Sequence, residues 1–244
     1  DTFIHKDYKK SDLKFVKRFN STRLEKNQFE EIIAYARNAG LNIAATPFDN
    51  ESLDWLEYFD VDIVKVASCS CDDWVLLKAI AKLDRKIVIS TGGVSLEHLK
   101  KVYSLFKKEG RDISFMHCVG EYPTPHTGAD LHRITRMRDT FPDVEIGFST
   151  HESPNTRTLA PFAVAMGCTI LEKHVGHETE QISLNAYSLK REEMAAVIDE
   201  IQYMSVASSG HSTQQFTALA ALKRGAYLKK SKEAGTTITL DDLY

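Results

Sequence analysis

Two histidines each follow a short apolar run that closes on a polar residue. His151 ends the run IGFSTH (146–151), and His174 ends TILEKH (169–174). The stretch between them, 155–167, has helical spacing, so the two runs are expected to be neighbouring parallel strands with a histidine at the same end of each. Two imidazoles at one edge of a sheet can hold a metal ion. A histidine at a strand end is also often a hydrogen-bonded structural residue, and that role stays open for both.

Hydroxyl groups, lysines and one further histidine lie at or near the ends of the apolar runs. These candidates are Thr46, Lys65, Ser68, Ser90 with Thr91, His117, Ser149 and Lys173. Such groups suit a small anionic substrate, because hydroxyls donate hydrogen bonds to phosphate oxygens and lysine neutralises their charge. Lys65 stands inside an otherwise apolar strand, where an ammonium group is costly unless it faces a functional cavity. The alternative for each Ser or Thr is capping of the next helix, and His117 could be wholly structural.

The sequence Ser90-Thr91-Gly92-Gly93 joins a strand to a helix that Ser95 is expected to cap. We expect the amides of this loop to face an anion, with the helix dipole behind them.

Apolar runs alternate with amphipathic stretches along the chain, and the strands are expected to end near residues 46, 68, 91, 118, 150 and 174. Continuous apolar strands are typical of a parallel sheet that is covered on both faces. Six βα units in a row favour an α/β fold of the (β/α)₈ TIM-barrel type over a doubly wound sheet, and no GxGxxG follows the first strand. Because about six units are visible, we expect the first two to be missing from this chain, and we expect the 244 residues alone to be inactive.

Helical spacing also predicts which side chains face the sheet. The predicted inward positions are Phe29, Ile32, Ile33 and Ala36; Leu96, Leu99, Val102 and Phe106; Leu131, Ile134, Met137 and Phe141; Leu159, Phe162, Ala163 and Met166; and Met194, Val197, Ile198 and Ile201.

Three segments follow from these patterns. Residues 1–204 are the barrel domain, N-terminally incomplete, and 205–223 are a polar linker. Residues 224–244 are expected to begin a small β-rich domain, with one strand, a turn and a second strand. About twenty residues are too few to form a stable domain alone.

Composition sets the broad class. The 244 residues are 43% hydrophobic and 27% charged, with a formal net charge of -3, which gives no reason to expect a nucleic-acid or membrane partner. No apolar run approaches the length of a membrane span, and the N-terminus lacks a signal-peptide core. The four cysteines lack zinc-site spacing and are expected to be reduced thiols in a cytoplasmic protein.

Six short blocks resemble the sialic acid synthase family, the phosphoenolpyruvate-dependent nonulosonate synthases, including its branch called spore coat polysaccharide biosynthesis protein E. In chain order the blocks are ATPFD (45–49), KVAS (65–68), ISTGG (89–93), MHCVGEYPTP (116–125), GFSTH (147–151) and LEKH (171–174). The likeness covers about residues 26–204. The tail from 224 to 244 resembles the opening of that family's C-terminal antifreeze-like (SAF) domain.

The resemblance implies an enzyme that condenses phosphoenolpyruvate with an N-acylated amino sugar, giving a nonulosonic acid and phosphate. It implies that His151 and His174 bind a divalent metal, Mn²⁺ foremost, with Mg²⁺ or Co²⁺ as alternatives, and that both act in catalysis with Lys65. It also implies that Tyr122 faces the sugar and that the protein is a domain-swapped homodimer. The residues implied to bind phosphoenolpyruvate are Thr46, Lys65, Ser68, Ser90 and Ser149.

Several positions depart from the family pattern. Cys69-Ser70 replaces a common Gly-Glu pair, Thr150 stands where many members have Asp, and Gly120 replaces a polar residue. Asn185 lies near the position of an expected aspartate and is a further candidate for substrate binding. The metal and phosphoenolpyruvate blocks are largely kept while the sugar side is altered, so the identity of the sugar stays open.

Two other functions stay open from the sequence. One is a metal-dependent aldolase or lyase on the same barrel, which would release no phosphate. The other is a non-catalytic barrel that binds a sugar phosphate, which the replaced carboxylates would fit.

Overall fold

The structure, a computed structural model, consists of two compact units, one ending at Ser208 and the other beginning at Ser209. Expectations for residues 1–19 and for most of the linker lie outside the described residues. The described residues are 20–156, 158–180, 182–210 and 222–244.

A six-stranded sheet with its strands in chain order forms the centre of the first unit. Every neighbouring pair of strands is parallel, as the continuous apolar runs predicted. The strands are β1 (Ala44–Ala45), β2 (Ile63–Val66), β3 (Lys86–Ser90), β4 (Ile113–Cys118), β5 (Glu145–Thr150) and β6 (Ile170–Lys173).

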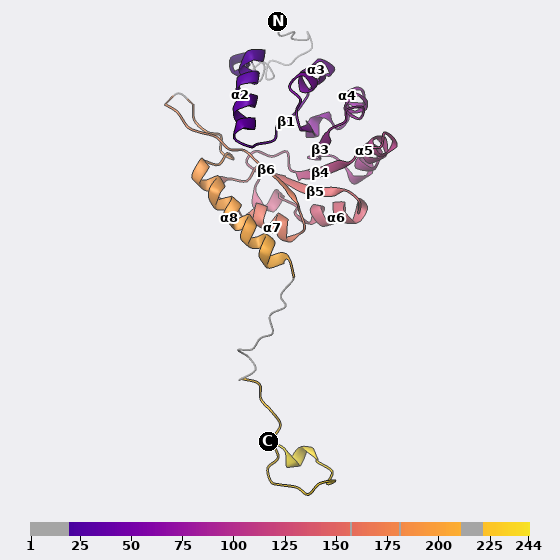
Figure 1. Cartoon of the computed structure of the whole chain (residues 1–244), viewed down its shortest axis with the longest axis vertical. Coiled ribbons are helices and arrows are strands. Elements are labelled where there is room, and N and C mark those ends of the chain that lie inside the picture. The colour runs from indigo at the N-terminus through magenta and orange to yellow at the C-terminus, as the bar shows by residue number, and fades with distance from the viewer. Residues whose placement is uncertain (1–19, 157, 181, 211–221) are drawn as a thin grey trace. The chain divides into compact units, whose positions relative to one another are not determined.

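Helices follow the strands and surround the sheet on its outer side (Figure 1). Several begin at side-chain caps: Asp49 accepts a hydrogen bond from the Ser52 amide, and Ser95 accepts one from the His98 amide, as predicted for Ser95. The helices are α2 (Lys26–Asn38), α3 (Asn50–Tyr58), α4 (Trp74–Ile80), α5 (Leu96–Lys108), α6 (His132–Thr140), α7 (Leu159–Ala165) and α8 (Arg191–Ser208), and the short 3₁₀ turns of this unit are Ser68–Ser70, His126–Gly128 and Pro154–Thr156.

The sheet is strongly curled. In a flat sheet β2 and β6 would lie about 19 Å apart, because adjacent strands are spaced by about 4.8 Å. Instead Lys65 of β2 reaches Glu172 of β6, with 2.5 Å between its Nζ and a carboxylate oxygen. Curling of this kind encloses the inner face of the sheet, as in a barrel. The first unit is therefore a TIM-barrel-like half-barrel of the α/β class.

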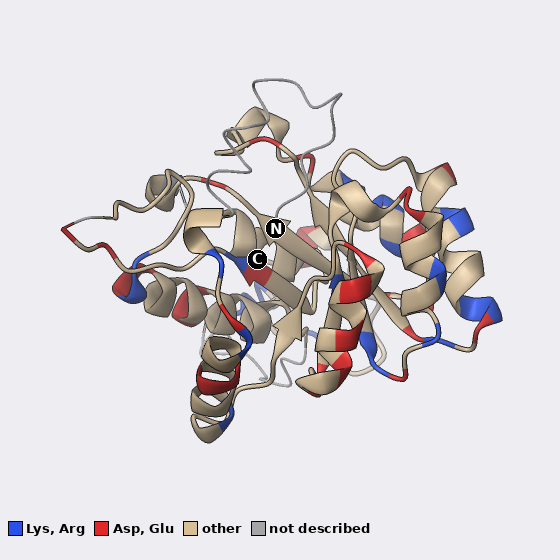
Figure 2. Ribbon diagram, turned by 90° about the horizontal axis from the view of Figure 1, so that it is seen from above, with Lys and Arg blue, Asp and Glu red and all other residues tan. Residues whose placement is uncertain are grey.

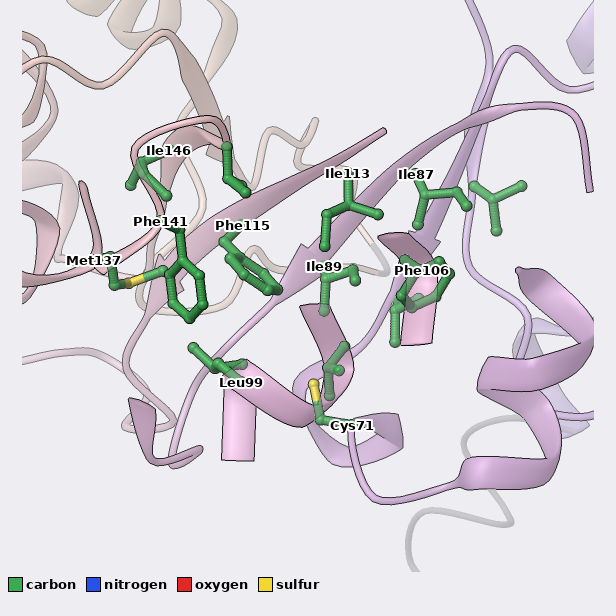
Figure 3. Close-up of a cluster of buried hydrophobic side chains, with 14 of the residues drawn as sticks. Cys71, Ile87, Ile89, Leu99, Phe106, Ile113, Phe115, Met137, Phe141 and Ile146 are labelled. Atoms are coloured by element: carbon green, nitrogen blue, oxygen red, sulfur yellow. The ribbon is translucent and has the colours of Figure 1, made fainter. Parts of the chain in front are cut away.

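The main core lies between the sheet and its helices (Figure 3). Leu99, Val102 and Phe106 of α5 are fully buried, as are Ile134 and Met137 of α6. These positions match the predicted inward faces. Burial of side chains of this size stabilises the fold by about 1.5–3 kcal/mol each relative to exposure.

The predicted inward face of α2 is only partly covered in this structure, with Ile33 and Ala36 half-buried. None of its residues is buried, and Ile32 is 53% exposed. Phe29 packs edge-on against Trp55, with ring centroids 5.9 Å apart. The physical reason is that β1, the strand beside α2, has only two residues, so it gives an amphipathic helix little sheet to cover.

The helices α7 and α8 also differ from the expectation. The stretch expected to be one helix over 155–167 begins with a 3₁₀ turn, and Phe162 is 55% exposed rather than buried. Leu159 and Ala163 join the main core while Ala160 packs with Val197 of α8, so α7 is buried on two sides and Phe162 lies on the third.

The last helix, α8, runs to Ser208 and so extends into the segment expected to be linker. Val197 is buried and Met194 and Ile201 pack beside it, but Ile198 is 42% exposed, which contradicts its predicted inward position.

The second unit does not show the two expected strands in its described residues, 222–244. It has one antiparallel bridge, between Leu228 and Leu243, and a 3₁₀ turn, Leu240–Asp242. Ile238 is 52% exposed and Leu240 is 88% exposed. A two-stranded pairing with no apolar face to bury is at best marginally stable, which accounts for the missing strands.

Charged residues of both signs are interspersed over the outer helices of the first unit (Figure 2). No helix within the described ranges is long and apolar enough to cross a membrane.

Candidate active site

Two groups of side chains lie at the carboxyl ends of the strands and in the segments that follow them. We call the first the anion side: Lys65, Ser68, Ser90, Cys118, Ser149 and Glu172. We call the second the aromatic side: Tyr122, His151, His174 and Tyr187.

Three residues of the anion side meet at one carboxylate oxygen. Lys65 Nζ lies 2.5 Å from Glu172 Oε1, and the Ser149 hydroxyl donates to the same oxygen at 2.8 Å. The Lys65 side chain is 20% exposed and that of Glu172 is 37% exposed, so the pair is partly screened by solvent. Charge-assisted bonds of this length hold a flexible lysine in one position. The sequence predicted Lys65 and Ser149 but not their common partner Glu172.

Ser68, Gly92 and Cys118 form a tightly packed group beside this contact. The Gly92 amide donates to the Ser68 hydroxyl at 2.9 Å. A Cβ atom at Gly92 would lie 3.0 Å from Ser68 Oγ and 3.3 Å from the Cys118 carbonyl oxygen, so a close approach requires glycine here. Burial raises the pKa of the Cys118 thiol, and the hydroxyls of Ser149 and Ser68 oppose this rise. Cys118 is therefore a neutral thiol at pH 7.

Ser90 is the unsatisfied member of the anion side. Its side chain is 3% exposed, and Oγ has no hydrogen-bond partner among the described residues. An unpaired buried hydroxyl costs about 1–3 kcal/mol, which an incoming oxygen acceptor would recover. The structure thus gives Ser90 a physical reason to bind a ligand.

Two of the amides after Ser90, which were expected to face an anion, have partners within the protein. The Thr91 amide donates to the Met116 carbonyl, and the Gly92 amide is taken by Ser68. The start of α5 is capped by Ser95. The anion site at this loop therefore stays a prediction, and the Gly93 amide and the Ser90 hydroxyl are its remaining candidate donors.

The two histidines of the aromatic side lie together, as their positions on neighbouring strands predicted. Their ring centroids are 5.2 Å apart, and His151 is 6% exposed. Burial, with His174 nearby, lowers the pKa of His151 to about 4, and burial lowers the pKa of His174 as well. Both imidazoles are therefore neutral at pH 7, the form that ligates metals.

The histidine pair fits a divalent metal with open coordination positions. His151 Nδ1 lies 3.3 Å from the Val119 carbonyl oxygen, a contact that would direct Nδ1–H there and leave Nε2 as the ligand atom. Among the residues that the structure describes, no group of three or more His, Cys, Asp or Glu side chains could hold a metal ion. His151 and His174 would supply two ligands, so water or substrate would supply the others.

Tyr122 and Tyr187 complete the aromatic side. The Tyr122 ring lies 4.3 Å from His151 and 5.4 Å from Tyr187, and the Tyr187 ring lies 4.9 Å from His174, between ring centroids. Tyr122 was predicted from its family block, whereas Tyr187 was missed. Its position within an irregular stretch with no helical or strand spacing carries no signal that sequence periodicity could detect.

The remaining predicted residues lie apart from these contacts. Thr46 is half-buried just after β1, and among the described residues no hydrogen bond joins it to the other candidates. Asn185 Oδ1 accepts from the Tyr187 amide and the Ser188 hydroxyl, so its oxygen stabilises a turn. His117 is buried, with Nε2 2.8 Å from the Ala129 carbonyl oxygen, and its ring stacks on Phe148. These contacts fit a structural role for His117, the alternative that the sequence left open.

The fold and the site define a TIM-barrel-like protein with a lysine and several hydroxyl groups beside a histidine pair at the carboxyl ends of its strands. The family model described as NeuB family matches residues 1–213, and the chain belongs to this family. The resemblance to sialic acid synthases is thereby confirmed.

Three relatives illustrate the similarity. The N-acetylneuraminate-9-phosphate synthase of Mus musculus is 30% identical over 222 residues, 89% of this chain and 61% of the mouse protein. The N,N'-diacetyllegionaminic acid synthase of Campylobacter jejuni is 33% identical over 154 residues, 62% of this chain and 45% of that protein. A crystal structure described as a spore coat polysaccharide biosynthesis protein E from Chromobacterium violaceum superimposes with a TM-score of 0.88 and 38% identity, covering 100% of this chain and 74% of that one. The chain spans about three fifths of the mouse relative.

Proposed function

We propose that the protein condenses phosphoenolpyruvate with an N-acylated amino sugar to give a nonulosonic acid and phosphate. The observation that carries this proposal is the meeting of Lys65 and Ser149 at Glu172, on the strands β2, β5 and β6, with the histidine pair following β5 and β6. A small anion and a polarised carbonyl group would then lie next to one another. The relatives named as N-acetylneuraminate-9-phosphate and legionaminic acid synthases support the same reaction class.

The anion side would bind phosphoenolpyruvate. Lys65 neutralises charge on the phosphate or carboxylate group, and Ser68 and Ser90 donate hydrogen bonds to its oxygens. Ser149 donates to Glu172 in the unliganded site, so its hydroxyl would turn from that carboxylate to the ligand. Glu172 holds the ammonium group of Lys65 in place. Thr46, at the end of β1, is the remaining proposed contact. Catalysis on such a rim depends on fixed donors that need no rearrangement during the reaction.

The reaction balances without an oxidant or reductant. The C3 carbon of phosphoenolpyruvate attacks the aldehyde carbon of the open sugar, and the aldehyde oxygen takes up a proton. Water adds its oxygen to C2 and gives up both protons, one to the former aldehyde oxygen and one to the departing phosphate. The bond between C2 and the phosphate ester oxygen breaks, and C2 becomes the keto carbon of the product. His151 and His174 would hold a divalent ion, Mn²⁺ foremost, which would supply Lewis acidity to the aldehyde. Tyr122 and Asn185 would lie on the sugar side of the site.

The finer features of the family belong to this proposal too. They are a (β/α)₈ barrel containing the six βα units, an SAF-type domain that includes residues 224–244, a domain-swapped homodimer and a cytoplasmic location. The similarity to solved structures over the whole chain supports the barrel. A metal-dependent aldolase or lyase, or a non-catalytic barrel, lacks this support, because the named relatives are synthases.

Phosphate release tests the proposal. The full-length protein is incubated with phosphoenolpyruvate, Mn²⁺ and one acceptor: N-acetylmannosamine, its 6-phosphate, or the diacetamido-trideoxyhexoses that correspond to legionaminic and pseudaminic acids. We expect phosphate to appear only when an acceptor is present, in a 1:1 ratio with the nonulosonic acid. Equal release without a sugar, or no release with any of the four, would contradict the proposal.

A further inference from the structure

Tyr187 is held firmly although it lies in an irregular segment between β6 and α8. Its amide donates to Asn185 Oδ1 at 3.2 Å. Two residues later, the Leu189 amide donates to the His174 carbonyl at 2.9 Å, and the Leu189 carbonyl accepts from Gly176 at 3.0 Å. Leu189 itself is fully buried in the small cluster beneath α8. The backbone is therefore anchored on both sides of the tyrosine, as a preformed binding wall requires.

The ring of Tyr187 contacts residues from three other places in the fold. It lies 4.9 Å from His174 and 5.5 Å from His151, nearly perpendicular to both, and 5.4 Å from Tyr122. The Tyr122 ring is 55% exposed, and Tyr187 is half-buried. Two phenol rings thus stand together directly beside the proposed metal ligands, and one of them keeps a large accessible surface.

The aromatic side differs chemically from the anion side. Its members are aromatic rings that contact one another. An aromatic face carries partial negative charge and attracts C–H hydrogens. An N-acylated amino sugar offers such hydrogens on its carbon chain and on the acyl methyl group. The charged groups of phosphoenolpyruvate instead require the lysine and the hydroxyls of the anion side.

We propose that Tyr187 is a specificity-determining residue of the acceptor subsite, packing with Tyr122 against the N-acyl group of the sugar whose aldehyde carbon lies at the histidine pair. This inference rests on the proposed function. It assigns the ring, rather than the hydroxyl, as the recognising part of Tyr187.

Three variants separate this role from a structural one. Tyr187→Ala removes the ring, Tyr187→Phe keeps it, and Tyr203→Ala removes a tyrosine that is 77% exposed on α8. We expect Tyr187→Ala to raise the KM for the acceptor about tenfold, the range that apolar pocket contacts contribute, while the KM for phosphoenolpyruvate changes by less than about twofold. Tyr187→Phe and Tyr203→Ala should match the unmodified protein.

The size of the acyl group gives a second readout. With N-acetyl and N-propanoyl forms of the accepted sugar, Tyr187→Ala should shift the kcat/KM ratio toward the larger group by about tenfold. Mn²⁺ affinity, measured by calorimetry, should stay within about threefold, since the histidine ligands remain. An unchanged ratio, or a loss of Mn²⁺ affinity that accounts for the loss of rate, would overturn the inference and leave the synthase activity in place.

Binding distinguishes failure of the inference from failure of the proposed function. If the unmodified protein releases no phosphate, the proposed function fails, and saturation-transfer NMR with N-acetylmannosamine on the phosphoenolpyruvate-loaded protein then decides the subsite. Sugar binding that is lost in Tyr187→Ala and kept in Tyr187→Phe supports the inference. Equal binding in all variants, or none in any, overturns it.

Discussion

The anion side and the aromatic side of the candidate site are built differently. Lys65, Ser90, Ser149 and Glu172 all lie on strands of the curled sheet, so the packed core beneath fixes their positions. Tyr122 and Tyr187 lie in connecting segments, where changes in sequence disturb the core little. The comparison teaches that the charged contact between Lys65 and Glu172 is built on the sheet, while the aromatic surface beside the histidines is built largely from connecting segments. This matches the family departures, which concentrate on the sugar side.

The largest expected effect comes from the histidine pair of the aromatic side. His174→Ala should lower turnover by at least about 100-fold. Removing only the group that hydrogen-bonds to a metal ligand already lowers metal affinity or activity by about 10–100-fold, and this change removes the ligand itself. Phosphate release measures the rate, and urea denaturation checks that the fold is kept. His177→Ala, which removes an exposed histidine three residues away, is the matched control. Near-normal turnover in His174→Ala would remove the metal assignment.

The next effect should fall on the anion side alone. Lys65→Ala removes a charged hydrogen-bond donor and leaves Glu172 without its cation. We expect the KM for phosphoenolpyruvate to rise about thirtyfold, equivalent to about 2 kcal/mol, and the KM for the sugar to change little. Steady-state kinetics with each substrate varied in turn would show this. Lys78→Ala, on the exposed surface of α4, should have no effect, and equal changes in both KM values would break the division into two sides.

The smallest expected effect is on phosphoenolpyruvate affinity when one of two glycines near the site is replaced. Gly92→Ala would press a methyl group against Ser68 and the Cys118 carbonyl, whereas Gly120→Ala meets no atom within 4 Å. We expect Gly92→Ala to weaken phosphoenolpyruvate binding by about three- to tenfold, because shifting packed atoms costs about 1 kcal/mol or more. Gly120→Ala should leave it unchanged. Phosphoenolpyruvate titration followed by calorimetry would test both, and equal affinities would show that Ser68 can move without cost.

Sequence reasoning predicted the parallel order of the strands and most of the core, because periodicity and caps are local properties. Leu99, Val102, Ile134 and Met137 occupy the predicted interior. The prediction of inward-facing side chains failed where burial depends on the neighbouring elements that a helix packs against. Ile32 remains exposed because β1 is short, and Phe162 is exposed because α7 packs on both the sheet and α8.

The sequence by itself determined which residue types stand at the strand ends, and hence that a lysine, several hydroxyls and two histidines share one rim. Only the tertiary structure decided their partners. Lys65 and Glu172 are 107 positions apart, and their contact depends on how far the sheet curls. The place of Tyr187 against both histidines depends on the path of an irregular segment anchored by Leu189. Neither curl nor loop path leaves a periodic pattern in the sequence, since both result from packing between distant elements.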